Sequence, residues 1–438
     1  MSKGLYYIVK LIINIQKLGK GGTSFPGKFA LSRKPDVLAN FTLPDNRVFI
    51  SGTNGKTSTA NSLAKLFEQT GRKITHNAEG ANMLQGITTT FFQKANSKYQ
   101  IKSDHLIIEI DELTMPLVFK YVSPKSLIIT NLFDDQIDRY GGKWALAKTL
   151  SEQLPKDITL YINGDDPTLI WLCQQLKPRK VIYFGLRKTE LQKNKIDSSS
   201  NQEICPRCQR ELHYEKNFYD SIGKFSCDCG FKSHELDYEA KDIDLENGSF
   251  NVNEQIYHMP YQQIYLIYNM LAVIAYASEN GIKTKQISES LSQKINIAGR
   301  FEYLDFNEKQ AWLNLVKNPA GLNQSLDFLD RELIKLEDMS ANIFIAFNNK
   351  PADGLDTSWI KQSNFNLLKK QSVHKIYLAG DLKDEMAKVF SDLNFDKNKI
   401  VMIEHVEDII KTEKQNSYQN YFISNFTMLN EVRNAIVK

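Results

Sequence analysis

The sequence predicts an α/β protein: a parallel sheet with helices on its faces, followed by a smaller α/β domain. Short apolar runs that end at polar or glycine residues alternate with helix-length segments from about residue 46 to residue 186. This alternation is typical of strand–helix–strand units, in which helices cover a parallel sheet. A second series of the same kind begins near residue 301. We therefore expect a second, smaller sheet there.

The individual elements follow from these runs. In the first series, strands are expected at residues 47–52, 105–111, 126–133, 159–166 and 180–185, with a helix at 62–71. Two more helices are expected at residues 264–282, which contain a glycine stop, and 288–295. In the second series, strands are expected at residues 342–349, 375–381, 399–405 and 420–425, with a helix at 384–394. Ligands of parallel sheets bind at the carboxyl ends of the strands, where polar residues lie in this sequence.

Composition limits the class of protein. The chain has 438 residues, of which 42% are hydrophobic and 24% charged, and its net charge is +4. These values are typical of a folded, multi-domain chain and exclude a mostly disordered or fibrous protein. The near balance of charge gives no reason to expect nucleic acid as a partner.

The N-terminal segment, residues 1–45, is expected to be helical. Its apolar run at residues 5–15 is about half as long as a bilayer crossing requires and contains Lys10. No small-residue cleavage site follows the run, so we expect a cytoplasmic protein. As a helix, the run has a broad apolar surface with lysines around it, which we interpret as a packing helix. Contact with a membrane or a partner is the alternative.

The strongest local signal is SGTNGKT, Ser51–Thr57, between an expected strand and an expected helix. Glycines let backbone amides close around phosphate, and the N-terminus of the helix adds its dipole. Lys56 supplies a cation, and the Thr57 hydroxyl can hold magnesium. The alternative is a glycine turn with a surface lysine. The pattern favours a nucleotide site formed by Gly52, Thr53, Asn54, Gly55, Lys56, Thr57 and Ser58.

The loop is two residues shorter than the usual phosphate loop, because Ile50 stands where the longer loop has its first glycine. In this it resembles the loop of the Mur ligase and folylpolyglutamate synthase superfamily. The resemblance implies that Lys56 and Glu109 are catalytic and that Glu109 and Thr57 hold magnesium. It also implies nucleotide contacts by Asn269 and Arg300.

Further polar residues occur in the order that the superfamily has around its nucleotide: Thr130, Asn131, Asp135, Asp138, Asn163, Asp165 and Asp166. Gln136 stands where the superfamily usually has a histidine. Each acid alone would more often be a solvated or capping residue, so their joint order carries the argument.

Within the superfamily the chain resembles the MurT family, in the segments 79–89, 130–141, 316–326 and 352–359. The resemblance implies a Mur-ligase-type central ATP-binding domain at residues 46–299 and a Rossmann-like C-terminal domain at residues 300–438. The segment before residue 46 is too short for a uridine-nucleotide-binding domain, which agrees with the lipid-linked substrate of the family. Asn314 stands where superfamily ligases often have aspartate.

Four cysteines form two tight pairs inside an insertion at residues 204–234: Cys205, Cys208, Cys227 and Cys229. Four thiolates satisfy tetrahedral Zn²⁺, and so small a segment has too little core to fold without metal. We therefore predict a structural zinc ribbon, with a pair of disulfides as the alternative. Cys173, in an apolar helical stretch, is interpreted as an inert core residue.

The five cysteines bear on how a ligase that makes an amide would obtain its ammonia. Hydrolysis of glutamine requires a thiol nucleophile in a strained turn, and none of the five cysteines fits. Ammonia must then be free or come from a second chain, and the resemblance implies a GatD-like glutaminase whose Cys-His pair is completed by Asp356. On physical grounds Asp353 or Asp356 could equally cap the following helix.

The expected function is therefore ATP-dependent amidation of the α-carboxylate of D-glutamate in the lipid II stem peptide, through an acyl phosphate, with ATP, Mg²⁺ and Zn²⁺. A peripheral location at the inner face of the membrane agrees with that substrate. One alternative is a folylpolyglutamate-synthase-like ligase acting on a soluble carboxylate. The other is a nucleic-acid-binding or scaffold protein built around the zinc module.

Overall fold

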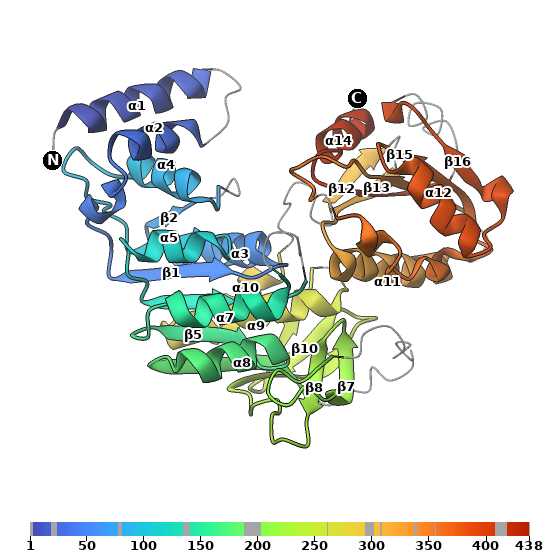
Figure 1. The fold of residues 1–438 in the computed structure, drawn as a ribbon, viewed down its shortest axis with the longest axis horizontal. Coiled ribbons are helices and arrows are strands. Elements are labelled where there is room, and N and C mark those ends of the chain that lie inside the picture. Colours follow the sequence, from blue (N-terminus) through green and yellow to red (C-terminus); the bar gives the residue numbers. More distant parts are fainter. Residues whose placement is uncertain are drawn as a thin grey trace. The chain divides into compact units, whose positions relative to one another are not determined.

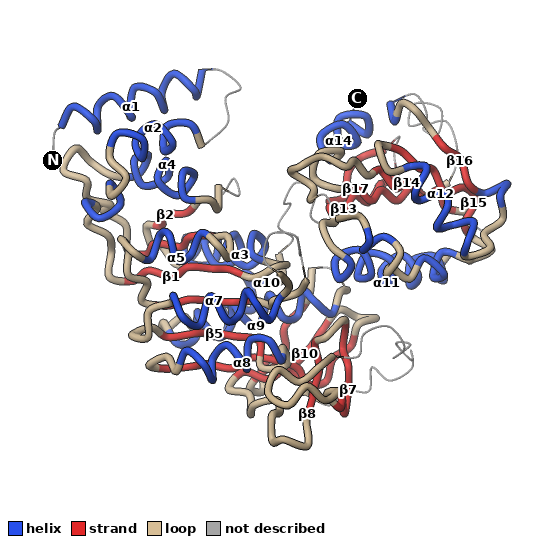
Figure 2. The backbone as a smooth tube through the Cα atoms, viewed as in Figure 1, coloured by secondary structure: helices blue, strands red, loops and turns tan. Residues whose placement is uncertain are grey.

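The computed structural model describes residues 3–18, 24–77, 81–134, 141–187, 203–260, 262–293, 302–306, 309–336, 340–354, 356–407 and 418–437. The chain forms two compact units (Figures 1 and 2). The first comprises residues 1–133 and 143–294, and the second comprises residues 134–142 and 295–438. The domain boundaries expected from the sequence stay predictions.

The first unit is built on a sheet with nine strands among the described residues, in the order β11-β10-β9-β6-β5-β4-β1-β3-β2. Neighbours from β9 to β2 are parallel, as predicted, whereas β10 and β11 add an antiparallel edge. The strands are β1 (Asn46–Ser51), β2 (Ile74–His76), β3 (His105–Glu109), β4 (Ser126–Ile129), β5 (Thr159–Asn163), β6 (Lys180–Leu186), β9 (Tyr238–Asp244), β10 (Ser249–Val252) and β11 (Gln255–His258).

Helices lie on both faces of this sheet (Figure 1). They are α3 (Lys56–Gln69), α5 (Thr114–Phe119), α7 (Lys143–Gln153), α8 (Pro167–Leu176), α9 (Ile264–Glu279) and α10 (Thr284–Leu291), while α4 (Leu84–Lys94) lies beyond the β2 edge of the sheet. The expected core helix is confirmed as α9, which is buried from Ile267 to Ala277. The next helix, α10, begins four residues before its predicted start.

The N-terminal helices α1 (Lys3–Leu18) and α2 (Phe25–Arg33) pack with α4 (Figure 1), and a short 3₁₀ turn (Val37–Asn40) leads into β1. The Tyr6 hydroxyl donates to the Ala95 carbonyl at 3.0 Å. A Cβ on Gly27 would lie 1.9 Å from the Gln85 carbonyl oxygen, so only glycine permits α2 to approach α4 this closely. Among the described helices, none is long and apolar enough to cross a membrane.

The insertion forms a small antiparallel ribbon. Its strands are β7 (His213–Tyr219) and β8 (Ile222–Ser226). Isolated bridges join Ile204 to Glu211 and Ser226 to Lys232. These contacts bring the two cysteine pairs to one end of the ribbon.

The second unit has a six-stranded sheet, in the order β12-β13-β17-β14-β15-β16. It is parallel except for the β12/β13 hairpin. The strands are β12 (Glu302–Phe306), β13 (Lys309–Leu315), β14 (Ala341–Ala346), β15 (Val373–Ala379), β16 (Ile400–Met402) and β17 (Gln419–Ser424). The helices are α11 (Pro319–Lys335), α12 (Lys383–Asp392) and α14 (Leu429–Val437), with 3₁₀ turns at Ser358–Ile360, Phe365–Leu368 and Lys397–Lys399.

Candidate active site

The predicted phosphate loop lies between β1 and α3, at the carboxyl edge of the first sheet. Gly52 and Gly55 have φ values of 127° and 87°, which L side chains rarely adopt. A Cβ on Gly52 would lie 2.2 Å from Thr130 Oγ1, and one on Gly55 would lie 2.2 Å from Asn269 Oδ1. Glycine is therefore required at both positions by conformation and by space.

Thr130 and Asn131, which follow β4, hold the loop from the neighbouring strand. The Thr130 hydroxyl donates to the Asn54 carbonyl at 2.6 Å. The Asn131 amide donates to the same carbonyl at 3.0 Å and accepts from the Asn54 backbone N–H at 2.9 Å. The Thr53 N–H donates to the Asn131 carbonyl at 3.0 Å. The adjacent strand thus fixes the loop before any ligand binds.

Lys56 begins α3 and folds back over the loop. Its Nζ donates to the Gly52 carbonyl, to the Thr53 carbonyl at 3.2 Å and to Glu112 Oε1 at 3.1 Å. Burial raises the pKa of Glu112 to about 7 although Lys56 lies beside it. Burial alone would lower the pKa of Lys56, but nearby carboxylates, Glu112 foremost, raise it. The ammonium therefore stays charged at neutral pH.

Glu112 was missed by the sequence analysis. It lies three residues beyond Glu109, in the polar stretch that follows β3. A second acid just past the end of a strand is the signal that could have indicated it.

Glu109 ends β3, as predicted, with an exposed fraction of 2%. Its Oε1 accepts from the Asn82 amide at 2.9 Å, and its backbone exchanges two hydrogen bonds with the Asn77 side chain at 2.8 Å. Thr57 lies in the first turn of α3. A hydroxyl and a carboxylate at one edge of the sheet are donors of the kind that Mg²⁺ prefers.

The loop surroundings fit a phosphate group. The N-cap residue of α3 is Gly55, which has no side chain to cap the helix, so the first backbone N–H groups of α3 can bind an anion. Asn269, on α9, is buried next to Gly55, and its Nδ2 has no hydrogen-bond partner within the described part of the chain. A buried amide of this kind is costly unless a ligand accepts its hydrogen bond.

The acids after β5 serve the fold. Asp166 is the N-cap of α8: its Oδ1 accepts from Thr168 N at 2.8 Å, and its Oδ2 accepts from Leu132 N at 2.8 Å. Asp165 Oδ2 accepts from Leu186 N at 2.7 Å and from the Tyr268 hydroxyl at 2.9 Å. Burial raises the pKa of Asp165 to about 7 and that of Asp166 to about 6.

The capping interpretation is therefore the one that the structure supports for Asp166. Asn163 Oδ1 accepts from Asp165 N at 3.0 Å, again inside the unit. Other expected residues lie outside the described part of the chain: Asp135, Gln136, Asp138 and Arg300.

The four paired cysteines meet in space. Their sulfur atoms all lie within 4.8 Å of one another, at 3.6 Å for Cys205 and Cys229 and 3.4 Å for Cys208 and Cys227. Sulfur ligands at about 2.3 Å from a tetrahedral Zn²⁺ are roughly 3.8 Å apart. All five cysteines are free thiols. The geometry fits a zinc ion and does not contain the alternative disulfides.

The ribbon is anchored on the first unit by polar and aromatic contacts. Lys143 Nζ, on α7, donates to Glu203 Oε1 and to Ser221 Oγ, the latter at 3.1 Å. The ring of Tyr219 lies 5.9 Å from that of Phe133 and 5.7 Å from that of Tyr268. Phe133 N in turn donates to Thr53 Oγ1 at 2.9 Å. A short series of contacts therefore joins the ribbon to the phosphate loop.

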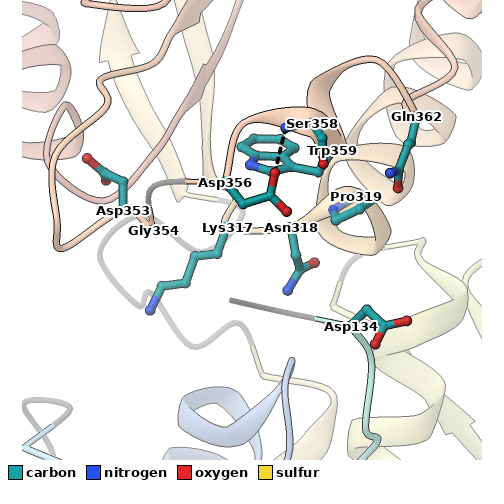
Figure 3. A pocket seen from close by; sticks show the side chains of 10 residues that line it. All are labelled: Asp134, Lys317, Asn318, Pro319, Asp353, Gly354, Asp356, Ser358, Trp359 and Gln362. Carbon is teal, nitrogen blue, oxygen red and sulfur yellow. Dashed lines mark hydrogen bonds between the residues drawn. The ribbon is translucent and has the colours of Figure 1, made fainter. Parts of the chain in front are cut away.

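The second unit contains a pocket beside the start of α11 (Figure 3). Residues that line it include Lys317, Asn318, Pro319, Asp353, Gly354, Asp356, Ser358, Trp359 and Gln362. The two candidate acids differ there. Asp353 accepts from Thr427 N at 2.9 Å and from the Thr427 hydroxyl at 2.5 Å, so both its oxygens bind within the unit.

Asp356 uses only one oxygen. Its Oδ1 accepts from Ser358 N at 2.9 Å, as a cap residue does, whereas no described residue pairs with its Oδ2. In Figure 3 the Asp356 carboxylate points toward Asn318, and that of Asp353 points away. The structure thus separates two acids that the residue pattern left equivalent.

Asn314, near the end of β13, is buried within the second unit. Its Nδ2 donates to Ser325 Oγ at 2.8 Å, and Ser325 Oγ donates to the Gly321 carbonyl at 3.0 Å. These contacts tie β13 to α11. Cys173 is buried in α8, and burial raises the pKa of its thiol well above the usual value. Such a thiol is a poor nucleophile.

Comparison with known proteins first defines a class. Residues 50–226 match the Mur ligase middle domain. The fold is similar to that of a pseudomurein peptide ligase type C from Methanothermus fervidus (TM-score 0.66, 21% identity, 92% of this chain and 80% of that chain covered). It is also similar to MurF from Acinetobacter baumannii (TM-score 0.62, 12% identity, 93% and 80% covered). The chain is an ATP-dependent ligase with the Mur ligase fold.

The particular family follows from residues 315–429, which match the MurT ligase C-terminal domain. The MurT subunit of lipid II isoglutaminyl synthase (glutamine-hydrolyzing) from Staphylococcus aureus (strain N315) is 35% identical over 84% of this chain and 82% of its own length. The same subunit from Streptococcus pneumoniae (strain ATCC BAA-255 / R6) is 30% identical over 96% and 94%. The chain belongs to the MurT family.

Proposed function

We propose that this chain is the synthetase subunit that amidates the α-carboxylate of D-glutamate in lipid II, giving D-isoglutamine during peptidoglycan synthesis. The observation that carries the proposal is the phosphate loop, held by Thr130 and Asn131 next to Lys56 and Glu109. The proposed substrate is inferred from the relatives, which are named as subunits of lipid II isoglutaminyl synthase. The match to the MurT ligase C-terminal domain favours this substrate over a soluble carboxylate.

Each loop residue has a role in the proposed reaction. The α3 amides and Lys56 bind the β- and γ-phosphates of ATP, and Asn269 donates to the nucleotide. Thr57 and Glu109 would hold a Mg²⁺ ion, which would screen phosphate charge. A substrate carboxylate oxygen attacks the γ-phosphorus and ADP leaves, so an acyl phosphate forms. Ammonia then attacks the acyl carbon and phosphate leaves. Lys56 stabilises the charge that moves from the γ-phosphate to ADP.

The ammonia comes from a partner glutaminase in this proposal. Four of the five cysteines form the cluster at the ribbon, and the fifth, Cys173, is buried with a raised pKa. None suits the role of a thiol nucleophile. One carboxylate oxygen of Asp356 has no partner among the described residues, which supports the proposal that Asp356 orients a histidine of the partner. The proposed location is the cytoplasm, at the inner face of the membrane.

The test is a reconstitution with lipid II, ATP and Mg²⁺. We expect amidation with glutamine only when a GatD-like glutaminase is added, and amidation with ammonium in its absence. ADP should appear in equal amounts with the amide. Folate or free amino acids in place of lipid II should not increase ADP release. Increased ADP release with those substrates would favour the folylpolyglutamate-synthase-like alternative.

A further inference from the structure

Helix α1 has an apolar surface that the described residues of its unit leave exposed. Tyr7, Ile8, Leu11 and Ile15 have exposed fractions of 56%, 49%, 60% and 59%. At about 100° per residue, these four positions fall within an arc of about 100° around the helix axis. An ordinary globular surface has scattered apolar residues, but a continuous stripe of them indicates an interaction site.

The opposite side of α1 is fixed to the protein. Tyr6, Val9 and Ile13 are buried, with exposed fractions of 7%, 0% and 3%. The Tyr6 hydroxyl donates to the Ala95 carbonyl, and Lys10 Nζ donates to the Gln93 carbonyl at 3.0 Å. The helix lies outermost at its end of the first unit, beyond α2 and α4 (Figure 1). Its exposed stripe is therefore held facing away from the unit.

Charge is segregated around this stripe. Residues 1–35 contain seven lysines and arginines and no aspartate or glutamate, so they carry +7, whereas the whole chain carries +4 and the remainder therefore −3. Lys3, Lys10 and Lys17 recur every seven residues, which places their Cα atoms within about 40° of one another around the helix. Lys28 and Arg33, on α2, are exposed.

We infer that α1 docks the protein on the surface of an anionic lipid bilayer. An apolar stripe inserts at the boundary of headgroups and acyl chains, while flanking cations attract anionic headgroups. A protein partner that covered the stripe would need no acid-free basic flank. The inference rests on the proposed function only in that a lipid-linked substrate lies at such a surface.

The experiment measures cosedimentation of the full chain with vesicles, without substrate. Vesicles of equal parts phosphatidylglycerol and phosphatidylcholine are compared with vesicles of phosphatidylcholine alone. We expect binding to the anionic vesicles that weakens as salt rises from about 0.05 M to about 0.5 M. The variant Leu11→Ser/Ile15→Ser should bind at least tenfold more weakly.

A matched control is Ile256→Ser/Ile334→Ser, which changes two other exposed residues, 55% and 63% exposed, and should bind like the wild type. Both variants should keep the wild-type unfolding temperature and the wild-type rate of ammonium-dependent amidation of detergent-dispersed lipid II. If the wild-type protein showed no ammonium-dependent amidation, the proposed function would be contradicted, but the result of the vesicle experiment would still be valid.

Three outcomes would overturn the inference. The first is that the wild type binds neither vesicle, and the second is that Leu11→Ser/Ile15→Ser binds as strongly as the wild type. The third comes from sedimentation velocity without vesicles: a wild-type dimer that Leu11→Ser/Ile15→Ser converts to monomer would assign the stripe to a second copy of the chain.

Discussion

Two loops, one at the carboxyl edge of each sheet, differ in which groups their polar atoms form hydrogen bonds with. In the first unit, the loop after β1 is bonded to the adjacent strand through Thr130 and Asn131. In the second unit, the segment after β14 has two acids: both oxygens of Asp353 are hydrogen-bonded inside the unit, whereas one oxygen of Asp356 has no partner among the described residues. The first arrangement suits a ligand that must be held in one geometry, whereas the second suits a group supplied by another molecule.

The largest effect is expected at the first loop. Lys56→Ala should lower amidation with glutamine and with ammonium alike, on the order of a thousandfold, because phosphate charge in the transition state loses its cation. The fold should survive, since Glu112 has a pKa of about 7 and can be protonated once its partner is lost. Both rates are measured by chromatography of the muropeptide product.

Lys65→Ala, on the same helix but outside the loop, is the control and should be active. If Lys56→Ala kept the ammonium-dependent rate, the first loop would not be the site of phosphate transfer, and the contrast between the loops would disappear.

A substitution of Asp356 in the second loop should affect amidation with glutamine and amidation with ammonium differently. Asp356→Asn should lower glutamine-dependent amidation on the order of a hundredfold or more, because an unsupported imidazole is a poorer and wrongly oriented base. Amidation with a high concentration of ammonium should stay near the wild-type rate. Asp353→Asn, in contrast, should lower the free energy of unfolding by about 1–3 kcal/mol through its bonds to Thr427.

The paired rates decide among the roles of Asp356. A parallel fall of both rates would assign Asp356 to the ligase site or to the fold. If neither rate changed, the role of Asp356 would be limited to the hydrogen bond that it accepts from Ser358 N, which caps the turn.

Removal of the ribbon metal tests whether the first loop depends on a distant module. We expect one zinc per chain by elemental analysis, and Cys205→Ser should lower the free energy of unfolding on the order of 3 kcal/mol, because the small ribbon has little core of its own. Below the unfolding temperature, ATP should still bind at Lys56.

Cys173→Ala provides the comparison: it should keep the zinc and cost about 1 kcal/mol. Freshly purified wild-type protein without zinc would refute the metal assignment. A loss of ATP binding in Cys205→Ser at low temperature would instead show that the contacts through Tyr219 and Phe133 transmit the damage to the loop.

The smallest effect on amidation is expected at Asp165, which is hydrogen-bonded to Leu186 and Tyr268 outside the first loop. Burial raises its pKa from 3.8 to about 7, so the folded state binds its proton more tightly than the unfolded state. Its contribution to stability is present below pH 3.8 and is lost as the pH rises to about 7. Asp165→Asn should flatten this fall in the free energy of unfolding, by at most roughly 4 kcal/mol for a pKa shift of this size.

Urea unfolding over this pH range measures the effect, with the exposed Asp157→Asn as the control. An unaltered slope in Asp165→Asn would mean that other buried acids, such as Asp166, carry the pH dependence.

The phosphate loop could be predicted because its chemistry is local. Gly52, Gly55 and Lys56 are separated by a few residues, and the strand before them and the helix after them are evident in the apolar pattern. The same is true of the two cysteine pairs, since the two cysteines of each pair are close in sequence and four thiolates commonly bind Zn²⁺. Family resemblance, rather than spacing, supplied the order of the more distant polar residues.

Other features depend on contacts that a one-dimensional pattern does not contain. The pairing of Glu112 with Lys56 requires a long side chain to fold back across the loop. Asp166 looks like a ligand residue in sequence, but its position before α8 makes it a cap. The residue pattern could not choose between Asp353 and Asp356 because the choice depends on Thr427, which lies 74 residues beyond Asp353.

The segregated charge of the first 35 residues has a kinetic consequence. With +7 at one end of the sequence and −3 over the remainder, an approaching anionic surface attracts that end and repels the rest, so the protein is turned before it touches. A ligase held there would meet a lipid-anchored substrate by lateral diffusion within a thin layer instead of by three-dimensional search. Its useful substrate affinity is then set by the density of substrate in the layer rather than by a bulk concentration.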